Sequence, residues 1–458
     1  MGKQNERKER AQFSGRIGYV LATAGSAVGL GNIWRFPYLA AKYGGGIFLL
    51  VYLALAMTFG YTLMVSETAI GRMTRKSAVG AFREVGKRKG AVAGGWLNAI
   101  IPMLILPYYC VIGGWVCKYL FVYCAGQVKP AAADGFFGGF IGSAFGSEFW
   151  FLVFAALTIL VIVMGVESGV ERISKIMMPA MVVLGIFVAC YSISRPGAIE
   201  GVKYFLVPNF KNFSWMTVVA ALGQMFYSLS CAMGILITYG SYMKKDVDIE
   251  KASHQVIFFD SGIAIMAGLM IIPAVFAFSG GDAAALNAGP SLMFITMPKI
   301  FESMGFGRVI GLVFFLLVLF AALTSAISLA ETCTSTIQDE LGWKRFPACL
   351  LVFGIMIVLG TLSSLGYNLL SFVKIFGMQI LDFFDFLTNS LMMPIAALII
   401  CAVVLFSLRP DRIAQEVKLS SKFRFEKVYR IVVRWIAPAF ILVIFITSVL
   451  SVLGVLSM

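Results

Sequence analysis

The segment GSAVGLGNIWRFP, residues 25–37, places three glycines, an asparagine, an arginine and a proline inside the first apolar stretch of the chain. Gly25, Gly29 and Gly31 lower helix stability, and Pro37 cannot donate to the helical hydrogen-bond ladder. An opened helix frees carbonyl oxygens for a cation and turns a positive half-helix N-terminus toward an anion. The segment therefore predicts a mid-membrane sodium site beside a carboxylate, with close helix packing through small residues as the alternative.

Two polar residues of this segment, Asn32 and Arg35, favour the ion site, because polar groups inside a membrane span are costly and usually functional. A second interruption lies at residues 223–234, where GQMFYSLSCAMG places Ser228 and Ser230 in an otherwise apolar run. Paired broken helices are typical of membrane folds built from inverted repeats. The breaks fall in the first and sixth spans, which predicts five spans plus five, with one helix appended.

The elements that must position these residues are membrane helices. The chain has 458 residues, 60% of them hydrophobic and 13% charged, whereas a soluble domain has roughly half and a quarter. Spans of about 20 apolar residues predict an all-α polytopic membrane protein with eleven spans, at residues 15–40, 46–70, 92–124, 148–165, 174–194, 216–242, 254–279, 308–336, 346–364, 378–407 and 432–456.

Lysine and arginine gather on one side of these spans, which accounts for the net charge of +14 without a nucleic-acid partner. With the N-terminus inside, the cytoplasmic segments hold 27 of the 37 basic residues; they are 1–16, 72–90, 166–175, 243–252, 338–346 and 408–434. The positive-inside rule therefore predicts a cytoplasmic N-terminus and, after eleven spans, an outer C-terminus. The basic start MGKQNERKER is not a signal peptide.

Cysteine and histidine do not form a metal or redox motif in this sequence. The eight cysteines show no CxxC and no zinc spacing, which indicates buried free thiols. The single histidine, His254, cannot make a metal site of the usual kind. The sequence also lacks a nucleotide-binding loop, so an enzyme is not expected.

Several motifs carry a resemblance that covers nearly the whole chain, in order. AVGLGNIWRFP followed by YGGGIF resembles the first helix of the neurotransmitter:sodium symporters, the family of the bacterial amino acid transporter LeuT. VSETAIGR, PYYCVIGGW, GQMFYSLSCAMG, ITYGSYMKKD, FAALTS and LDFFDF extend it. The resemblance implies a LeuT-like 5+5 inverted repeat with unwound helices 1 and 6, plus one additional helix.

The resemblance implies two sodium sites. The first is formed by the carbonyl of Ala27, the side chains of Asn32, Ser228 and Asp260, and the substrate carboxylate. The second is formed by carbonyls of Gly25, Val28 and Ala321 with the hydroxyls of Thr324 and Ser325. Oxygen ligands suit a hard cation, and AALTS places its three ligands on one helix face, although serine and threonine there also fit packing between helices.

The resemblance also implies an α-amino acid site. A carboxylate would be held by the N–H groups of Leu30 and Gly31 and the Tyr109 hydroxyl, and an ammonium by Ala27, Tyr227, Ser228 and Ser230. Gly29 stands where monoamine transporters of the family carry aspartate, which leaves room for a substrate carboxylate. The expected side-chain pocket is apolar and uncharged, although each member taken singly is also typical of a core: Ser26, Ile105, Tyr109, Tyr227, Ala232, Met233, Ala326 and Leu329.

Gates and supporting residues follow from the same resemblance. Arg35 and Asp385 resemble the extracellular gate, and Arg10, Asp339 and Tyr242 resemble the cytoplasmic network, although Arg10 by itself also fits a membrane-surface charge. Glu67, deep in the second span, is expected to accept backbone N–H groups freed where the helices unwind. Gly169 and Pro179 resemble the fifth-helix Gly-x9-Pro element that permits unwinding, although Pro179 alone also fits a simple kink.

One position departs from the family pattern. Asp260 replaces the asparagine usual in the first sodium site, and Ala264 stands where chloride-independent members carry glutamate and chloride-dependent members serine. Tyr52 and Gln224, which resemble other chloride ligands, are present. Two sodium ions in a low-dielectric site need negative charge beyond the substrate carboxylate. We therefore expect Asp260 to supply that charge without chloride; the alternative keeps Asp260 as a sodium ligand with chloride bound.

The sequence thus predicts a sodium-coupled symporter that imports Leu, Ile, Met, Phe, Tyr or Trp by alternating access across a bacterial inner membrane. A non-transporting sensor or a channel-like protein on the same fold is the alternative. Its partners are the amino acid, sodium ions and the bilayer, with no nucleic acid. The expected single domain, 1–458, divides into a cytoplasmic tail at 1–14, repeats at 15–194 and 195–407, and a cytoplasmic loop with the eleventh helix at 408–458.

Overall fold

The computed structural model describes residues 10–86, 89–280 and 290–452, and two of its helices are interrupted where small and polar residues cluster. The first interruption follows α1 (Arg16–Ala27), where Val28 is extended before η1 (Gly31–Arg35) and α2 (Phe36–Lys42) continue after a bend of 56°. The second separates α12 (Trp215–Ser228) from α13 (Ile235–Tyr242). Both predicted breaks are confirmed. The first nine residues and the last six, parts of the predicted tail and eleventh span, lie outside the described residues.

Long apolar helices surround the two broken ones. The first half of the chain supplies α3 (Gly46–Leu55), η2 (Ala56–Gly60), α4 (Tyr61–Thr74), α6 (Lys89–Cys124), α9 (Ala144–Val163), η3 (Val166–Glu171) and α10 (Arg172–Ile193). The second half supplies α14 (Ile249–Ser279), α16 (Gly307–Leu341), α17 (Arg345–Leu365), α18 (Ile380–Asp385), η7 (Phe386–Met392), α19 (Met393–Ala402), η8 (Val403–Leu408), α20 (Arg409–Lys418), α21 (Glu426–Ile431), η9 (Val432–Ile436) and α22 (Ala437–Val452).

Nine helices in the described residues are long and apolar enough to cross a membrane, or ten if α1 with η1 and α2 forms one bent span. The sixth predicted span, 216–242, is present as the two helices α12 and α13 and completes the eleven. Its two pieces have 14 and 8 residues, too short to cross a bilayer singly. The tenth predicted span ends later than expected, because helical structure continues from η8 into α20.

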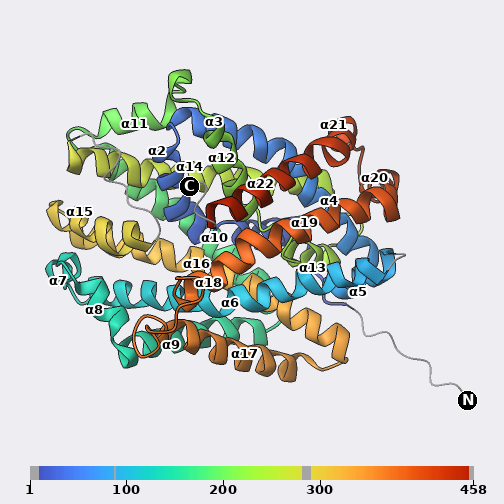
Figure 1. Cartoon of the computed structure of the whole chain (residues 1–458), viewed down its shortest axis with the longest axis horizontal. Coiled ribbons are helices and arrows are strands. Elements are labelled where there is room, and N and C mark those ends of the chain that lie inside the picture. Colours follow the sequence, from blue (N-terminus) through green and yellow to red (C-terminus); the bar gives the residue numbers. More distant parts are fainter. Residues whose placement is uncertain (1–9, 87–88, 281–289, 453–458) are drawn as a thin grey trace, which may run out of the picture.

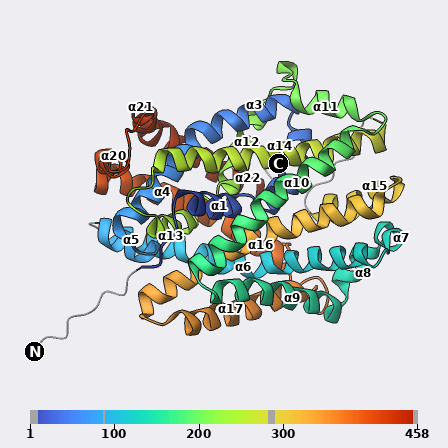
Figure 2. The same ribbon diagram turned by 180° about the vertical axis from the view of Figure 1, so that it is seen from behind.

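Short elements cap the two ends of the bundle (Figure 1). One end carries the N-terminal segment, α5 (Ala78–Val85), α20 and α21. The opposite end carries α7 (Val128–Ala132), α8 (Phe136–Gly142), α11 (Ala198–Leu206), η4 (Phe210–Asn212), η6 (Leu292–Thr296) and α15 (Met297–Ser303). Figure 2 shows α1 in the middle of the bundle, where it contacts α10, α14 and α16. The break in α1 is therefore enclosed by protein, which satisfies the condition for irregular backbone at membrane depth.

Candidate functional site

A buried carboxylate, Asp260 of α14, joins the two interrupted helices. Its Oδ1 atom accepts hydrogen bonds from Asn32 Nδ2 at 2.8 Å and from Ser228 Oγ at 2.7 Å. Tyr52 OH donates to the other oxygen, Oδ2, at 2.8 Å. Asp260 and Asn32 have no exposed surface. Three of the four residues expected at the first sodium site thus meet directly, and the fourth, Ala27, lines the same cavity as Asn32 and Ser228.

A second group of oxygens lies where α16 faces the end of α1. The hydroxyl of Ser325 lies 3.4 Å from the Gly25 carbonyl and 3.2 Å from the Val28 carbonyl. Thr324 Oγ1 lies 3.2 Å from the Ala321 carbonyl. Four of the five residues expected at the second sodium site therefore lie against one another, because Thr324 also packs against Gly25. The fifth, Ala321, lies one turn earlier on α16. Uncharged carbonyl and hydroxyl oxygens of this kind suit a small hard cation.

A small cavity of about 40 Å³ lies between the two breaks. Tyr109 OH accepts a hydrogen bond from the Leu30 N–H at 3.3 Å, and Ser230 Oγ donates to the Ser26 carbonyl at 3.1 Å. Residues expected at the substrate site and found in the cavity wall are Ser26, Ala27, Gly29, Leu30, Gly31, Ile105, Tyr109, Tyr227, Ser228, Ser230, Met233 and Leu329.

Two alanines expected in the pocket, Ala232 and Ala326, are buried but do not line this cavity. Ala232 has a positive φ of 59°, and its N–H donates to Glu67 Oε1 at 2.8 Å, so the backbone there turns toward α4. Ile235 and Ser325 line the cavity instead. Ile235 begins the helix after the break, a place that apolar patterning alone does not distinguish from core.

A second, larger cavity of about 310 Å³ lies on the opposite side of Tyr109 and Tyr227, which line both cavities. Arg35 and Asp385 both line it. The Arg35 guanidinium lies 5.3 Å from the centre of the Tyr227 ring, whereas Asp385 Oδ1 accepts from Asn389 Nδ2 at 2.6 Å. Among the described residues these two expected gate residues do not form an ion pair, so this side of the site opens into a cavity.

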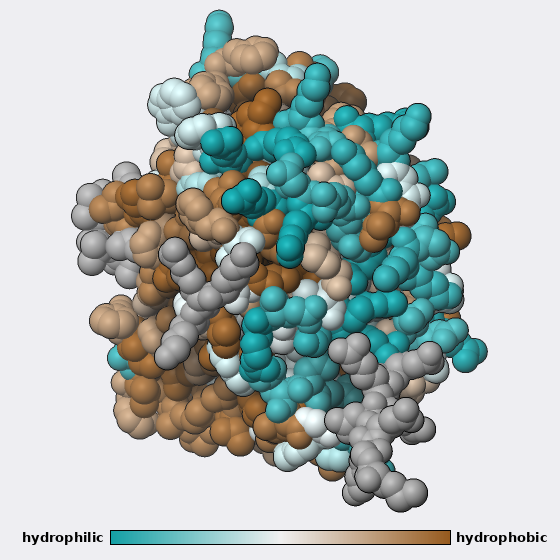
Figure 3. All heavy atoms as spheres, turned by 90° about the vertical axis from the view of Figure 1, so that its right-hand side faces the viewer, coloured by the Kyte–Doolittle hydropathy of each residue, from teal (hydrophilic) through white to brown (hydrophobic). Residues whose placement is uncertain are grey.

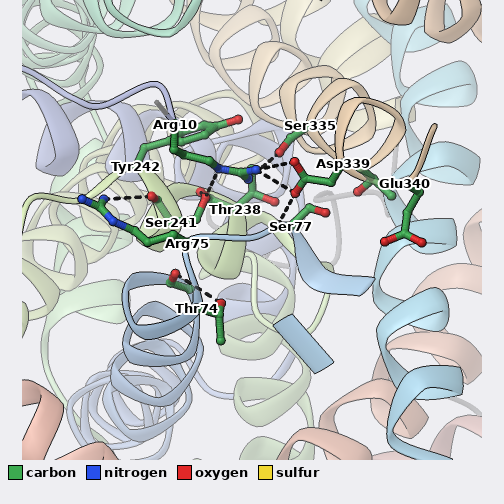
Figure 4. A network of polar contacts seen from close by, with 12 residues as sticks. Arg10, Thr74, Arg75, Ser77, Thr238, Ser241, Tyr242, Ser335, Asp339 and Glu340 are labelled. Carbon is green, nitrogen blue, oxygen red and sulfur yellow. Dashed lines mark hydrogen bonds and ion pairs between the residues drawn. The ribbon is translucent and has the colours of Figure 1, made fainter. Parts of the chain in front are cut away.

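The end that carries the N-terminal segment is closed by polar contacts (Figure 4). Arg10 lies 2.5 Å from Asp339 Oδ1 and donates to Ser241 Oγ at 3.1 Å and Ser335 Oγ at 2.8 Å. Its guanidinium also lies 5.1 Å from the centre of the Tyr242 ring. The three expected residues of this network are therefore in contact, and the structure adds two serines.

Three further expected residues, Glu67, Gly169 and Pro179, lie in helices that surround the two breaks. Glu67 is fully buried in α4 and holds the Ala232 N–H. Gly169 lies in η3, where an added Cβ would meet the Val161 carbonyl oxygen at 2.2 Å, and Pro179 lies inside α10. This region is wound in the structure, so the close approach at Gly169 is a packing requirement of the wound form.

Sequence reasoning missed two buried acidic residues near the closed end. Glu331 of α16 is fully buried; it pairs with Arg345 at 2.5 Å and accepts from Tyr242 OH at 2.8 Å. Glu171 accepts the Ser14 N–H at 2.8 Å and pairs with Lys175 at 2.5 Å. A carboxylate inside an apolar run is itself a signal of function, and it marks Glu331 in the sequence. Glu171 lies in the charged segment 166–175, which carries no such signal.

Comparisons with known proteins agree with this geometry. The model of the Sodium:neurotransmitter symporter family matches residues 10–130 and 143–455. The chain is 34% identical to the sodium-dependent transporter YhdH of Bacillus subtilis (strain 168), over 97% of this chain and 98% of the relative. It is 31% identical to the sodium-dependent transporter MJ1319 of Methanocaldococcus jannaschii, over 91% of this chain and 86% of the relative.

A solved structure is also similar: that of MhsT in complex with L-phenylalanine, with a TM-score of 0.86, 38% sequence identity, and coverage of 96% of this chain and 100% of that one. The fold and the family match define a sodium-dependent secondary transporter with many membrane spans, not an enzyme. The chain belongs to the sodium:neurotransmitter symporter family, as its motifs predicted.

Proposed function

We propose that this symporter imports a hydrophobic or aromatic L-amino acid (Leu, Ile, Met, Phe, Tyr or Trp) together with sodium. The observation that carries the proposal is the cavity between the two breaks, whose wall includes Ile105, Met233 and Leu329 and no ionisable acidic or basic side chain. Gly29 in that wall carries no charge, so the negative charge at this point is left to the substrate's own carboxylate. The similarity to a structure that contains L-phenylalanine supports the same class of substrate.

The two oxygen clusters support two sodium positions, one at Asn32, Ser228 and Asp260 with the Ala27 carbonyl, the other at Ser325 and the end of α1. The substrate carboxylate would complete the first position beside the Leu30 N–H. Because the ions and the amino acid share residues of one broken helix, each stabilises the arrangement that the others need. Shared ligands of this kind couple the sodium gradient to uptake.

Chloride independence is supported by the contacts of Asp260. The carboxylate already accepts the Tyr52 hydroxyl, one of the two polar groups that resemble chloride ligands. The other, Gln224, donates to the Gly31 carbonyl at 3.1 Å. A fixed negative charge held by one of these groups takes the place of a bound anion beside two cations.

The gates support alternating access between two repeats, 15–194 and 195–407. The Arg10 network closes one end, while Arg35 and Asp385 face a cavity at the other. With the N-terminus in the cytoplasm of a bacterial cell, this is an outward-facing arrangement. Substrate and sodium would bias a pre-existing equilibrium toward the inward-facing arrangement.

The test is uptake of labelled leucine, tyrosine and tryptophan into proteoliposomes, with sodium or potassium outside and chloride or gluconate as the anion. We expect uptake that requires sodium and is unchanged in gluconate. A chloride requirement would contradict the role of Asp260. Uptake of none of the three under any gradient would contradict transport of this substrate class and favour the sensor.

A further inference from the structure

The segment that joins the last two spans, residues 409–434, carries an excess of positive charge. It contains eight Lys and Arg and three acidic residues. All three acids are already engaged: Asp411 pairs with Arg430 at 2.6 Å, Glu426 with Lys418 at 2.7 Å, and Glu416 with the buried Arg72 at 2.7 Å.

Six basic side chains of this segment form no ion pair with another described residue, and we call them the basic rim: Arg409, Arg412, Lys422, Arg424, Lys427 and Arg434. All six are exposed. Figure 3 shows the end of the molecule that carries this segment, where hydrophilic residues gather beside a hydrophobic area. The rim is therefore available to bind negative charge from outside the chain.

Exposed apolar side chains alternate with the rim. Phe406 is 84% exposed just before Arg409, and Trp435 is 68% exposed just after Arg434. The Arg434 guanidinium lies 5.4 Å from the centre of the Trp435 ring. Aromatic residues next to arginine at the end of a span are typical of the headgroup level of a bilayer. The rim thus lies at the membrane boundary.

Arg434 makes the strongest case for a lipid. It lies at the third position of the predicted span 432–456, within the helical stretch Glu426–Thr447 that is long and apolar enough to cross a membrane. An exposed arginine at that depth must extend its guanidinium back to the headgroups to keep its charge solvated. A phosphate at that level is the partner that its planar donor fork fits best.

An apolar groove of about 400 Å³ lies beside the rim, between the start of α6 and the end of the tenth span. Its walls are Gly90, Ala91, Ile399, Ala402, Val403, Phe406 and Ser407. Arg409 follows directly, and it is exposed with a strained positive φ of 63°. The aliphatic walls of the groove suit an acyl chain, and the unpaired Arg409 beside them suits a phosphate. Both groups occur in one phospholipid molecule.

We propose that the basic rim and this groove bind an anionic phospholipid. The groove holds an acyl chain, and the rim holds the headgroup phosphate. The proposed orientation of the chain places this lipid in the cytoplasmic leaflet. The binding itself does not depend on that orientation. The segment that would hold the lipid is itself fixed to the bundle by two contacts. Glu416 pairs with Arg72 of α4, and Glu250 of α14 accepts the N–H groups of Arg424 and Phe425 at 2.8 and 3.0 Å.

Native mass spectrometry of the full chain in detergent tests the proposal without any transport step. Phosphatidylglycerol and phosphatidylcholine are titrated against the wild type and against the triple variant Arg409→Gln, Arg412→Gln, Lys422→Gln. Each basic residue near the headgroups contributes roughly fivefold in affinity, so we expect phosphatidylglycerol affinity to fall on the order of 100-fold. The loss for phosphatidylcholine is expected to be much smaller, because its choline cation offsets the charge of its phosphate. The matched control removes three exposed charges at the opposite end: Lys129→Gln, Lys211→Gln, Lys374→Gln.

Equal binding of the two lipids to the wild type would overturn the proposal, as would equal losses in the triple variant and the control. Ala402→Trp fills the groove and is expected to weaken both lipids; unchanged binding would overturn the role of the groove. Inorganic phosphate is expected not to displace phosphatidylglycerol. Displacement by inorganic phosphate would show that the rim binds a soluble anion, and it would overturn the proposal of a lipid ligand.

Discussion

Tyr52 and Asp260 are in direct contact inside the bundle: the tyrosine hydroxyl donates to Asp260 Oδ2 at 2.8 Å, while Oδ1 accepts from Asn32 and Ser228. One carboxylate therefore faces a candidate sodium site with one oxygen and a candidate anion ligand with the other. The proposed independence from chloride rests on this double contact.

Asp260→Asn is expected to make uptake depend on chloride. The substitution keeps the size of the side chain and removes the fixed negative charge, so two sodium ions lose compensation in a low-dielectric site. We expect uptake in gluconate to fall about 10-fold or more, with recovery in chloride; a loss of about 1.4 kcal/mol corresponds to that factor. Proteoliposome uptake in the two anions measures it.

The control for this substitution is Asp246→Asn, which removes the same charge from an exposed loop residue. It is expected to behave as the wild type in both anions. Asp260→Asn with equal uptake in gluconate and chloride would show that the carboxylate does not replace an anion.

Gly29→Ala is expected to abolish most sodium-dependent binding. A Cβ at this position would lie 2.8 Å from Ser325 Oγ and 3.1 Å from Tyr109 OH, so one methyl group would displace residues of both the second cation cluster and the cavity. We expect the apparent affinity for labelled leucine to fall about 10-fold or more. Equilibrium binding to the purified protein, with sodium varied, measures it.

Gly223→Ala is the matched control, because a Cβ there meets nothing within 4 Å and the residue lies in α12 near its break. Alanine favours a helix more than glycine does, so this variant is expected to bind as the wild type. Equal losses in the two variants would mean that the effect is one of backbone stiffness near the breaks, not of crowding at Ser325.

Arg10→Ala is expected to open the closed end. The substitution removes the ion pair with Asp339 and the hydrogen bonds to Ser241 and Ser335. The coupling free energy between a gate and a binding site is typically 1–3 kcal/mol. We therefore expect about 10-fold weaker sodium-dependent binding of an amino acid that enters from the end opposite Arg10. The measurement is leucine binding, together with the alkylation rate of a cysteine introduced at Ser335.

Arg83→Ala controls for the loss of a positive charge near the same helix end. Arg83 pairs with Glu340 at 2.6 Å, next to Asp339, but 55% of its side chain is exposed. The hydrogen bond to Glu340 raises the pKa of Arg83, yet an exposed pair contributes little to stability. We expect near wild-type binding; a loss equal to that of Arg10→Ala would assign the effect to surface charge.

Glu67→Ala is expected to lower thermal stability and Glu67→Gln to do so less. The Ala232 N–H is buried at a positive φ, and without an acceptor it would cost about 1–3 kcal/mol. Glutamine retains a carbonyl oxygen that can accept from the same N–H. The unfolding midpoint in detergent measures the difference, and identical midpoints for the two variants would contradict a role as acceptor.

The sequence by itself determined where the helices break and which residues surround the breaks. Glycines and small polar residues weaken a helix inside an apolar run, and the paired clusters at residues 25–37 and 223–234 therefore predicted the positions of the two breaks. The carboxylates Glu67 and Asp260 were equally visible, because a charge at membrane depth requires a partner. These are local properties of composition, whereas most residues of the cavity wall were expected from the family resemblance.

Only the tertiary structure decided which of these residues meet. Ala232 and Ala326 leave the cavity wall and Ile235 enters it, because the direction of a side chain after a break depends on backbone angles such as the positive φ of Ala232. Arg10 reaches Asp339, 329 positions away in the chain, while Arg35 and Asp385 remain apart across a cavity. Which end is closed depends on how whole helices pack against one another, and no local pattern of residues carries that information.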